Sequence, residues 1–496
     1  MTVRQRWAVL VAAAALCSGY LTSVSAMAPA ASAANLKDPW GTAAEVPGTN
    51  ALNAGGRADI TSVSCKSAGN CSAGGFYASG TAGGKPVKQA LVVTESGGRW
   101  GTAAEVPGSA ALNAGGTAQI DSISCSAPGD CSAGGYYSDA AGNAQAFVVN
   151  QAGGTWGTAE EVPGTAALDH SPGAEVLSVS CGAAGNCSAG GFYSDAAGHQ
   201  QAFVATETGG TWHTAQEVPG TATLNAGGYA AINSVSCAAA GACGAGGYYA
   251  STSVAGIPTV QALVVTETGG TWHTAQEVPG TAALNAGGYA AVSSVSCSAA
   301  AYCSAGGEYT NSTPATEAFV VSLHGGTWKT AHEVGGIGAL NSTGLAVVNS
   351  VSCVSPGNCS AAGAYEDANF DSQAFAVGQS GGTWGTAQEV PGTAALDQGS
   401  PGASAVSVSC GAVGDCSLGG YYSDASGQEQ AFVASEASGT WGTAEEVPGT
   451  AALNAGGAAG TDAVSCPSAG NCSTGGHYTT SQALQQAFVA EETGGP

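Results

Sequence analysis

The most regular side chain with possible catalytic chemistry is the glutamate of a repeated E-V-P-G motif. It occurs at Glu45, Glu105, Glu161, Glu217, Glu277, Glu333, Glu389 and Glu446. Hydrolysis of a glycosidic bond requires two carboxyl groups in different environments, one of which acts as an acid. Eight repeated positions have similar environments, so no single glutamate is distinguished. We expect a solvated or hydrogen-bonded position on a strand.

The seven histidines form no catalytic constellation. His213 and His273 occupy equivalent positions after a tryptophan, and the other five lie in different repeats without a nucleophile elbow. No phosphate-binding or dinucleotide-binding pattern opens a helix. We therefore expect a protein that is not an enzyme and that uses no cofactor.

Sixteen of the 17 cysteines form pairs with the spacing C-x5-C, and the remaining one, Cys17, lies near the N-terminus. The pairs are Cys65 and Cys71, Cys125 and Cys131, Cys181 and Cys187, Cys237 and Cys243, Cys297 and Cys303, Cys353 and Cys359, Cys410 and Cys416, and Cys466 and Cys472. In an exported chain this pattern indicates local disulfides. A zinc site would need two more ligands per pair, and the histidines do not follow such a spacing, so we expect no metal.

The first 33 residues have the pattern of a secretory signal peptide, with early arginines, an apolar run and an A-x-A cleavage site. We expect a short N-terminal segment over 34–39 and one domain over 40–496. No other stretch is apolar enough to span a bilayer, so we expect no membrane insertion and a secreted, extracellular protein. The net charge of −25 excludes nucleic acid as a partner, because phosphates bind clustered cations.

The chain consists of eight copies of one module, each marked by a tryptophan. These are Trp40, Trp100, Trp156, Trp212, Trp272, Trp328, Trp384 and Trp441. The second copy contains four strand signals separated by turn signals, over 118–125, 131–137, 145–150 and 156–162, and no helical periodicity. This predicts an all-β fold, a single eight-bladed β-propeller of four-stranded blades. The last module lacks its fourth strand, and we expect the N-terminal strand (40–46) to close the ring there.

The turn before each tryptophan, such as Glu207-Thr208-Gly209-Gly210-Thr211-Trp212, resembles the Asp-box hairpin of sialidase-like propellers. The first position is not Asp, which departs from that motif. In those families the hairpin is structural, which implies that the tryptophans are packing anchors. Sialidase-like catalysis also needs an arginine cluster, and only Arg57 and Arg99 remain after the leader.

The longer pattern S-V-S-C-x3-G-N-C-S-A-G-G-Y-Y, followed by Q-A-F-V and E-V-P-G-T-A-A-L-N, resembles a repeat of secreted actinobacterial propeller proteins and covers residues 40–491. Propellers similar to these occur in umbrella-shaped secreted toxin particles. There they act as lectin-like tips and as docking partners for an adaptor subunit. The resemblance therefore implies a toxin-particle subunit with a glycan or a secreted protein as its partner.

In a propeller, the loop entering the first strand and the loop joining strands two and three emerge on the same face. We expect ligand binding there by polar loop residues, because amides and carboxylates suit sugar hydroxyls, and oxygen clusters also suit Ca²⁺. The candidates are Asn53, Asn113, Asp139, Asp169, Asp195, Asn225, Asn285, Asn341, Asp397, Asp424 and Asn454. The alternative is that they are ordinary turn-forming residues.

The sixth module departs most from the repeat, and packing does not require its odd residues. Lys329, His332, Glu366, Asp367, Phe370 and Asp371 are therefore candidates for docking a partner. Our leading hypothesis is a non-catalytic binding propeller with lectin-like recognition, protein docking, or both. The alternatives are a glycan-degrading enzyme that uses the odd acids of module six, and a protease-resistant envelope or matrix protein.

Overall fold

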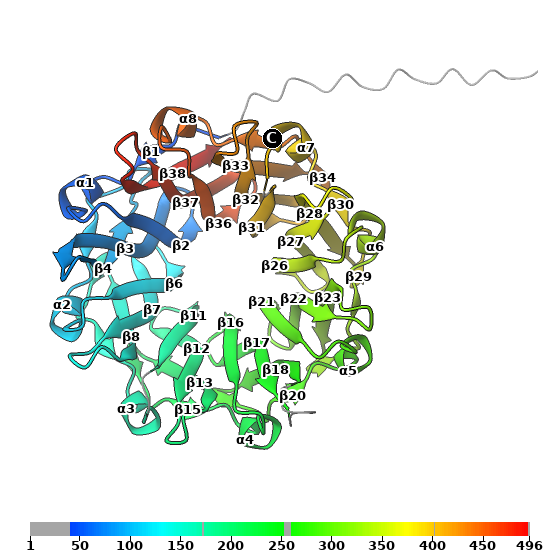
Figure 1. Cartoon of the computed structure of the whole chain (residues 1–496). Coiled ribbons are helices and arrows are strands. Elements are labelled where there is room, and N and C mark those ends of the chain that lie inside the picture. The colour runs from blue at the N-terminus through cyan, green and yellow to red at the C-terminus, as the bar shows by residue number, and fades with distance from the viewer. Residues whose placement is uncertain (1–39, 171–172, 252–258, 401, 495–496) are drawn as a thin grey trace, which may run out of the picture. The chain divides into compact units, whose positions relative to one another are not determined.

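The computed structural model describes residues 40–170, 173–251, 259–400 and 402–494. The predicted signal peptide and segment 34–39 lie outside these residues. The described residues form eight antiparallel sheets arranged in a ring, and the inner strands of successive sheets contact one another around it (Figure 1). The prediction of an eight-bladed propeller is confirmed.

Each blade contains three long strands. The inner strands are β2 (Ala58–Ser67), β6 (Ala118–Ala127), β11 (Glu175–Ala183), β16 (Ala230–Ala239), β21 (Ala290–Ala299), β26 (Ala346–Ser355), β31 (Ser404–Ala412) and β36 (Gly460–Ser468). The second strands are β3 (Asn70–Ala82), β7 (Asp130–Ser138), β12 (Asn186–Ser194), β17 (Ala242–Ala250), β22 (Tyr302–Thr310), β27 (Asn358–Glu366), β32 (Asp415–Ser423) and β37 (Asn471–Thr479). The third strands are β4 (Lys85–Thr94), β8 (Ala144–Ala152), β13 (Gln200–Thr208), β18 (Val260–Thr268), β23 (Thr316–His324), β28 (Ser372–Ser380), β33 (Glu429–Ala437) and β38 (Gln485–Thr493). We number the blades 1 to 8 in this order.

The fourth strand is not one continuous strand, which corrects the prediction for 156–162. Its first piece is β9 (Thr155–Trp156), β14 (Thr211–Trp212), β19 (Thr271–Trp272), β24 (Thr327–Trp328), β29 (Thr383–Trp384) or β34 (Thr440–Trp441). Its second piece is β1 (Ala44–Glu45), β5 (Ala104–Glu105), β10 (Glu160–Glu161), β15 (Gln216–Glu217), β20 (Gln276–Glu277), β25 (His332–Glu333), β30 (Gln388–Glu389) or β35 (Glu445–Glu446). Between the pieces the chain leaves its own sheet, because the backbone N–H of Ala159 donates to the carbonyl of Pro107 in the preceding blade (2.7 Å).

The expectation that the chain has no helix is also corrected. Within the described residues there are eight four-residue helices on the outer rim: α1 (Thr49–Leu52), α2 (Ser109–Leu112), α3 (Thr165–Leu168), α4 (Thr221–Leu224), α5 (Thr281–Leu284), α6 (Ile337–Leu340), α7 (Thr393–Leu396) and α8 (Thr450–Leu453) (Figure 1). Each begins after a glycine with a positive φ, such as Gly220 (φ 90°). One turn is too short to produce a periodic apolar pattern in the sequence.

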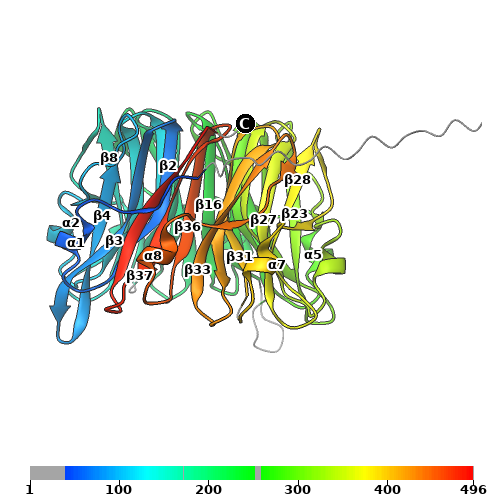
Figure 2. The same cartoon turned by 90° about the horizontal axis from the view of Figure 1, so that it is seen from above.

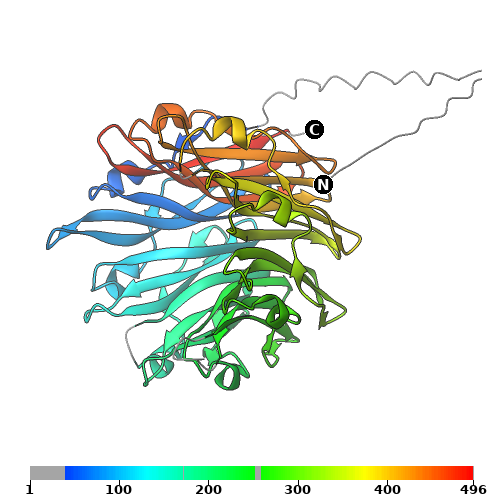
Figure 3. The ribbon, with the colours of Figure 1, turned by 45° about the vertical axis from the view of Figure 1, so that its right-hand side comes forward.

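Two neighbouring glycines explain why each second strand can lie so close to the next blade and to the inner strand of its own blade. A Cβ at Gly246 would lie 2.6 Å from a methyl carbon of Val292 in the next blade, and one at Gly247 would lie 2.0 Å from the carbonyl oxygen of Ala231. The third strand, in contrast, is buried on both faces, as its apolar run predicts: Phe147 and Val148 are fully buried. The blades are therefore dense and strongly twisted (Figure 3).

The ring closes between the two ends of the described chain. Strand β1 pairs with β38, with Ala44 opposite Val489, so the N-terminal strand completes blade 8 as expected. All eight predicted disulfides are present, and each links an inner strand to the second strand of its own blade. Eight disulfides fit an oxidising compartment. No helix among the described residues is long and apolar enough to cross a membrane.

The second serine of each S-V-S-C motif joins neighbouring blades near the ring axis. Its hydroxyl oxygen accepts a hydrogen bond from the backbone N–H of the first motif cysteine in the next blade, at 2.9–3.0 Å. The donors, in order around the described ring, are Cys65, Cys125, Cys181, Cys237, Cys297, Cys353, Cys410 and Cys466. We call this closed set the serine ring.

The first serine of the motif forms a parallel set of bonds that lacks one member. Seven of these serines accept from the next blade, as Ser234 does from Val295 (2.9 Å). In blade 8 the position is Ala463, so no side-chain oxygen is available there to reach blade 1. The seam between blades 8 and 1 therefore lacks one inter-blade hydrogen bond.

Removing one member of the serine ring should weaken the whole propeller. We expect Ser236→Ala to lower the free energy of unfolding by about 1–2 kcal/mol, because the N–H of Cys297 loses its acceptor in a largely buried position. The matched variant Ala463→Ser should instead raise the free energy of unfolding by about 1 kcal/mol, because its hydroxyl restores the missing hydrogen bond between blades 8 and 1. Guanidinium unfolding of both variants checks this, and equal effects of the same sign would contradict it.

Candidate functional site

The two ends of the propeller are built from different loops (Figure 2). At one end, which we call the disulfide end, the cysteine hairpin of each of blades 1 to 7 contacts the glycine hairpin of its own blade, as where Gly98 N–H donates to the carbonyl of Gly69 (2.9 Å). At the other end, the loops between second and third strands meet the turns that enter the inner strands, as where Gly115 N–H donates to Ser138 (2.8 Å). We call this end the variable face. Its two kinds of loop meet as the sequence predicts.

The six asparagines expected to bind a ligand on this face are buried. The side-chain amide of each donates to a backbone carbonyl in the third strand of the preceding blade, as Asn225 does to Gln200 (2.9 Å). The others are Asn53, Asn113, Asn285, Asn341 and Asn454. These amides tie neighbouring blades together. A ligand-binding role for them stays a prediction that no observed contact supports.

The five aspartates of the predicted site also have partners within the protein. Asp169 accepts from the N–H of Ser194, and Asp397 accepts from the amide of Gln373. The loop carboxylates Asp139, Asp195 and Asp424 each accept from backbone N–H groups two and four residues ahead. The turn-forming role considered from the sequence is thus what the structure shows for the loop aspartates. Their binding role likewise remains a prediction.

The six candidate docking residues of module six are not brought together. Glu366, Asp367, Phe370 and Asp371 lie on the variable face, where the loop after β27 turns. Lys329 lines a cavity at the disulfide end, and His332 lies in β25 at the outer edge. A single interface formed by all six is therefore excluded by their placement at opposite ends of the strands.

One position in each blade varies in chemistry while its neighbours repeat. It lies on the second strand, immediately before the buried tyrosine. The occupants are Phe76, Tyr136, Phe192, Tyr248, Glu308, Ala364, Tyr421 and His477. The residue that enters the inner strand varies in the same way, for example Arg57, Tyr229 and Leu345. Aligning the eight repeats by eye would have identified both positions, which the sequence analysis missed.

At the variable positions of blades 4, 5 and 6, aromatic and apolar side chains are exposed in an arc. Tyr229 (46% exposed), Tyr289 (39%) and Leu345 (47%) occupy the same entering position in three successive blades. Phe370 (71% exposed), in the loop of blade 6, lies on the same face. These four residues, which we call the arc, are most of the large apolar side chains that are exposed in the described chain. Exposed clusters of this kind mark binding surfaces.

Polar groups accompany the two tyrosines of the arc. The ring of Tyr229 lies 4.9 Å from that of Tyr248, whose hydroxyl accepts from the amide of Gln200 (3.0 Å). Burial, together with the nearby carboxylate of Glu308, raises the pKa of Tyr289. Burial also raises the pKa of Glu308. The arc thus combines aromatic faces with an amide and a carboxyl group.

An ion cluster lies near the same end, at the seam between blades 8 and 1. His477 Nδ1 lies 3.0 Å from Asp462 and 3.5 Å from Asp59. Burial alone would lower the pKa of His477, but the hydrogen bonds and charges of the two aspartates outweigh it and raise the pKa to about 11. Burial, and then the charge of Asp59, raises the pKa of Asp462. His477 therefore carries a proton at neutral pH.

The same three side chains have ligand atoms within 4.8 Å of one another, a spacing that a metal ion can bridge. A protonated imidazole does not ligate a metal, and its single positive charge offsets part of the negative charge of the two aspartates. Two other groups with this spacing contain Cys237 with Cys243 and Cys466 with Cys472, whose sulfurs are in disulfides. Those sulfurs are not available as thiolate ligands.

The ion cluster should make stability depend on pH. Because the folded pKa of His477 lies above that of an unfolded histidine, about 6.5, its contribution is complete below that pH and is lost as the pH rises toward 11. We expect the stability lost in His477→Gln to be larger at pH 6 than at pH 9, by roughly 1–3 kcal/mol. Unfolding curves at both pH values measure it. The exposed His199, 3.6 Å from Asp195, provides the control His199→Gln, which should show almost no such change.

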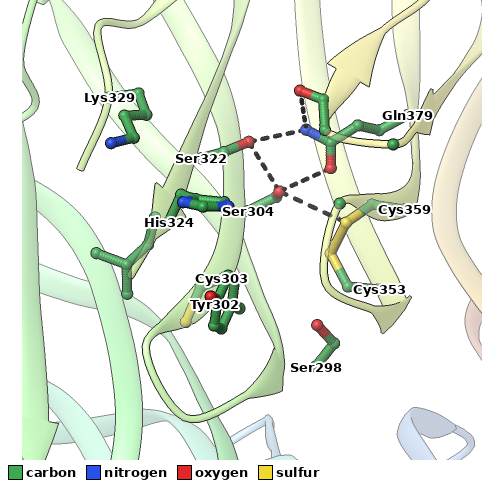
Figure 4. A pocket seen from close by; sticks show the side chains of 14 residues that line it. Ser298, Tyr302, Cys303, Ser304, Ser322, His324, Lys329, Cys353, Cys359 and Gln379 are labelled. Carbon is green, nitrogen blue, oxygen red and sulfur yellow. Dashed lines mark hydrogen bonds between the residues drawn. A yellow bond between two sulfur atoms is a disulfide. The ribbon is translucent and has the colours of Figure 1, made fainter. Parts of the chain in front are cut away.

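A cavity of about 320 Å³ lies at the disulfide end between blades 5 and 6 (Figure 4). Tyr302, His324 and Lys329 line one side, and the Cys353–Cys359 disulfide lines the other. The Gln379 amide donates to Ser322 (2.9 Å), so the polar groups at its base bond to one another. Its volume is at the lower limit for a ligand pocket.

The glutamates of the E-V-P-G motif have a structural role. In every blade the buried tyrosine of the second strand donates its hydroxyl to this glutamate, as Tyr249 does to Glu277 (2.9 Å). Burial, then the hydrogen bond to Glu277, raises the pKa of Tyr249. This bond fixes the short outer strand to its blade. The expectation of a hydrogen-bonded strand position is confirmed.

Comparisons with known proteins show similarity in backbone structure but not in sequence. No known protein family matches the chain, and no curated protein matches its sequence. Three solved structures illustrate this similarity. A protein of unknown function from Dyadobacter fermentans has 13% identity and a TM-score of 0.38, covering 64% of this chain and 94% of that one. The Hadza microbial sialidase Hz136 has 13% identity and a TM-score of 0.36, covering 82% and 73%.

The third is a subtype N11 neuraminidase-like protein of A/flat-faced bat/Peru/033/2010 (H18N11), with 12% identity and a TM-score of 0.31, covering 75% and 87%. These findings correct the expectation that the chain is not an enzyme. Two of the three similar structures are named as a sialidase and a neuraminidase-like protein, so the exclusion of catalysis is withdrawn. At these TM-scores the similarity supports no activity for this chain either.

Proposed function

We propose that this protein is a secreted propeller that binds glycans on its variable face, at the arc over blades 4 to 6. The observation that supports this most is the exposure of Tyr229 and Tyr289 at the same position of adjacent blades. A tyrosine presents a rigid apolar face and a polar tip, which suits the apolar face and hydroxyl rim of a sugar ring. Two such rings in adjacent blades suit two sugar units of one chain.

The neighbouring polar groups support a glycan in the same way. The amide of Gln200 and the carboxyl group of Glu308 lie beside the tyrosines and have the donors and acceptors that sugar hydroxyls need. The net charge of −25 favours neutral or basic ligands over anionic ones. Neutral oligosaccharides are therefore the ligand class that the arc fits best.

A second function is favoured by the other half of the arc. Leu345 and Phe370 are exposed on blade 6, beside a loop that also contains the acidic residues Asp367 and Asp371. Large exposed apolar side chains are typical of protein contacts. This half supports docking of a secreted protein, as in the extracellular toxin particles whose propellers the repeat resembles.

Single substitutions separate the two functions. Tyr229→Ala and Tyr289→Ala should each weaken binding on an array of neutral glycans by about tenfold, the effect expected when one aromatic contact is lost. Leu345→Ala and Phe370→Ala should leave the glycan signal within about twofold of wild type. Val413 is exposed (56%) in the cysteine hairpin of blade 7, at the disulfide end, so Val413→Ala is a control that removes an exposed apolar group elsewhere.

The protein partner is identified by recovering the tagged protein from the supernatant of its native host and analysing what co-purifies with it. A stoichiometric secreted companion that is lost with Leu345→Ala and Phe370→Ala, but kept with Val413→Ala, supports docking at the arc. Glycan binding that survives in the two tyrosine variants would show that the glycan site lies elsewhere.

A further inference from the structure

Near the disulfide end, third strands of neighbouring blades approach each other through polar side chains. In the seam between blades 2 and 3, Glu207 accepts from the amide of Asn150 (2.7 Å) and from Ser132 (3.0 Å). In the seam between blades 7 and 8, Glu492 accepts from two serines, both at 2.8 Å. In both seams a buried acid from one blade meets neutral donors from its neighbour.

The seam between blades 8 and 1 differs from these. Glu95 of blade 1 occupies the position of the buried acid, but Glu491 of blade 8 occupies the position of the neutral donor. Glu95 is only 2% exposed, and neither of its carboxylate oxygens has a hydrogen-bond partner among the described residues. Two carboxyl groups thus face each other across the point where the ring closes.

Nothing in the described chain compensates this pair of acids. Glu491 accepts from the indole N–H of Trp100 (2.8 Å) and from the hydroxyl of Ser473, which are neutral donors. Every ion pair among the described residues involves a histidine, and none of them includes Glu95 or Glu491. A buried carboxylate without a donor or a positive charge is costly, so a missing cationic partner is the simplest explanation.

The seam contains space for such a partner. A cavity of about 100 Å³ is lined by Glu95, Glu491, Glu492, Ser473 and Asn471, together with backbone of both hairpins. At about 30 Å³ per water, this volume holds a cation with two or three waters. The polar groups in the lining are oxygen-bearing, and Cys71, which also lines the cavity, is in a disulfide; such groups suit a hard divalent cation and not zinc.

We propose that the cavity between blades 8 and 1 binds a divalent cation of the Ca²⁺ type, held between the carboxylates of Glu95 and Glu491. Ca²⁺ tolerates irregular geometry and takes carboxylates, carbonyls and waters together, which fits two acids in a small and partly open space. The cation joins the first and last blades at the seam that also lacks a serine hydrogen bond. This site is distinct from the arc and does not depend on the proposed glycan binding.

The test compares the chelator-stripped protein with and without Ca²⁺. Saturating Ca²⁺ should raise the Tm of the wild-type protein by about 3 °C, as expected for binding at one hundred times Kd in a chain of this length. Glu95→Gln should abolish this rise. Glu207→Gln changes an equivalent buried acid whose seam has neutral donors, so it should keep the rise and serve as the matched control.

A spectroscopic measurement reports the position of the ion independently of stability. Tb³⁺ replaces Ca²⁺ at oxygen sites, and Trp100, bonded to Glu491, is placed to sensitise its luminescence. We expect Tb³⁺ emission in the wild-type and Glu207→Gln proteins, competed by Ca²⁺ and lost in Glu95→Gln.

Three outcomes would overturn the proposal. In the first, the Tm of the wild-type protein does not respond to Ca²⁺ and no Tb³⁺ emission appears. In the second, the wild-type, Glu95→Gln and Glu207→Gln proteins all respond equally, which would place the cation elsewhere on this acidic surface. In the third, Glu95→Gln is more stable than the wild type at pH 8 and neither protein responds to Ca²⁺, which shows that Glu95 and Glu491 share a proton.

Discussion

The hydrogen bond from a serine of one blade to the backbone of the next is the interaction on which the rest of this structure depends. It is made by the second serine of the S-V-S-C motif and recurs at every seam, including the one that joins the last blade to the first. An outer set of bonds runs parallel to it, in which Ala103 N–H donates to the carbonyl of Pro47, with counterparts around the rim. Between these two sets the blades approach so closely that the first position of the glycine pair on the second strand is always glycine, or alanine in blade 6. A closed ring of this kind holds the outward residues of each blade in fixed relative positions without large loops.

The closing seam is where the repeated pattern is least complete. Ala463 stands where other blades have a serine, and Glu491 stands where they have a neutral donor or a small residue. On the variable face of the same seam, Asp59, Asp462 and His477 form a partly buried ion cluster between the two blades. Charge thus replaces neutral hydrogen bonds at both ends of this seam. Joining the first and last blades through ionisable side chains makes closure of the ring sensitive to protons and, at the proposed site, to cations.

Much of the framework was predictable from the sequence because the same pattern of strands, turns and cysteines occurs in all eight modules. The cysteine pairs, the buried third strand and the completion of blade 8 by residues near Trp40 follow from local patterns and from spacing. The one-turn helices were missed because four residues show no periodicity, and the split outer strand was missed because Ala159 bonds to another blade. The asparagines were misjudged as displayed residues for a related reason: the amide of Asn225 is buried by the preceding blade, which only the closed ring places there. The arc forms because equivalent positions of different blades become neighbours in the ring. The sequence of one module does not show which positions these are.

We propose that the repeated framework carries a variable face on which Tyr229 and Tyr289 bind a ligand. Hydroxyl-radical footprinting of the protein, with and without the neutral glycan that gives the strongest array signal, tests this most directly. The account predicts that protection on binding falls on Tyr229 and Tyr289, while Val413 at the disulfide end keeps its oxidation rate. Protection of Val413 or of Tyr302, with Tyr229 unchanged, would contradict it and place recognition at the opposite end of the propeller.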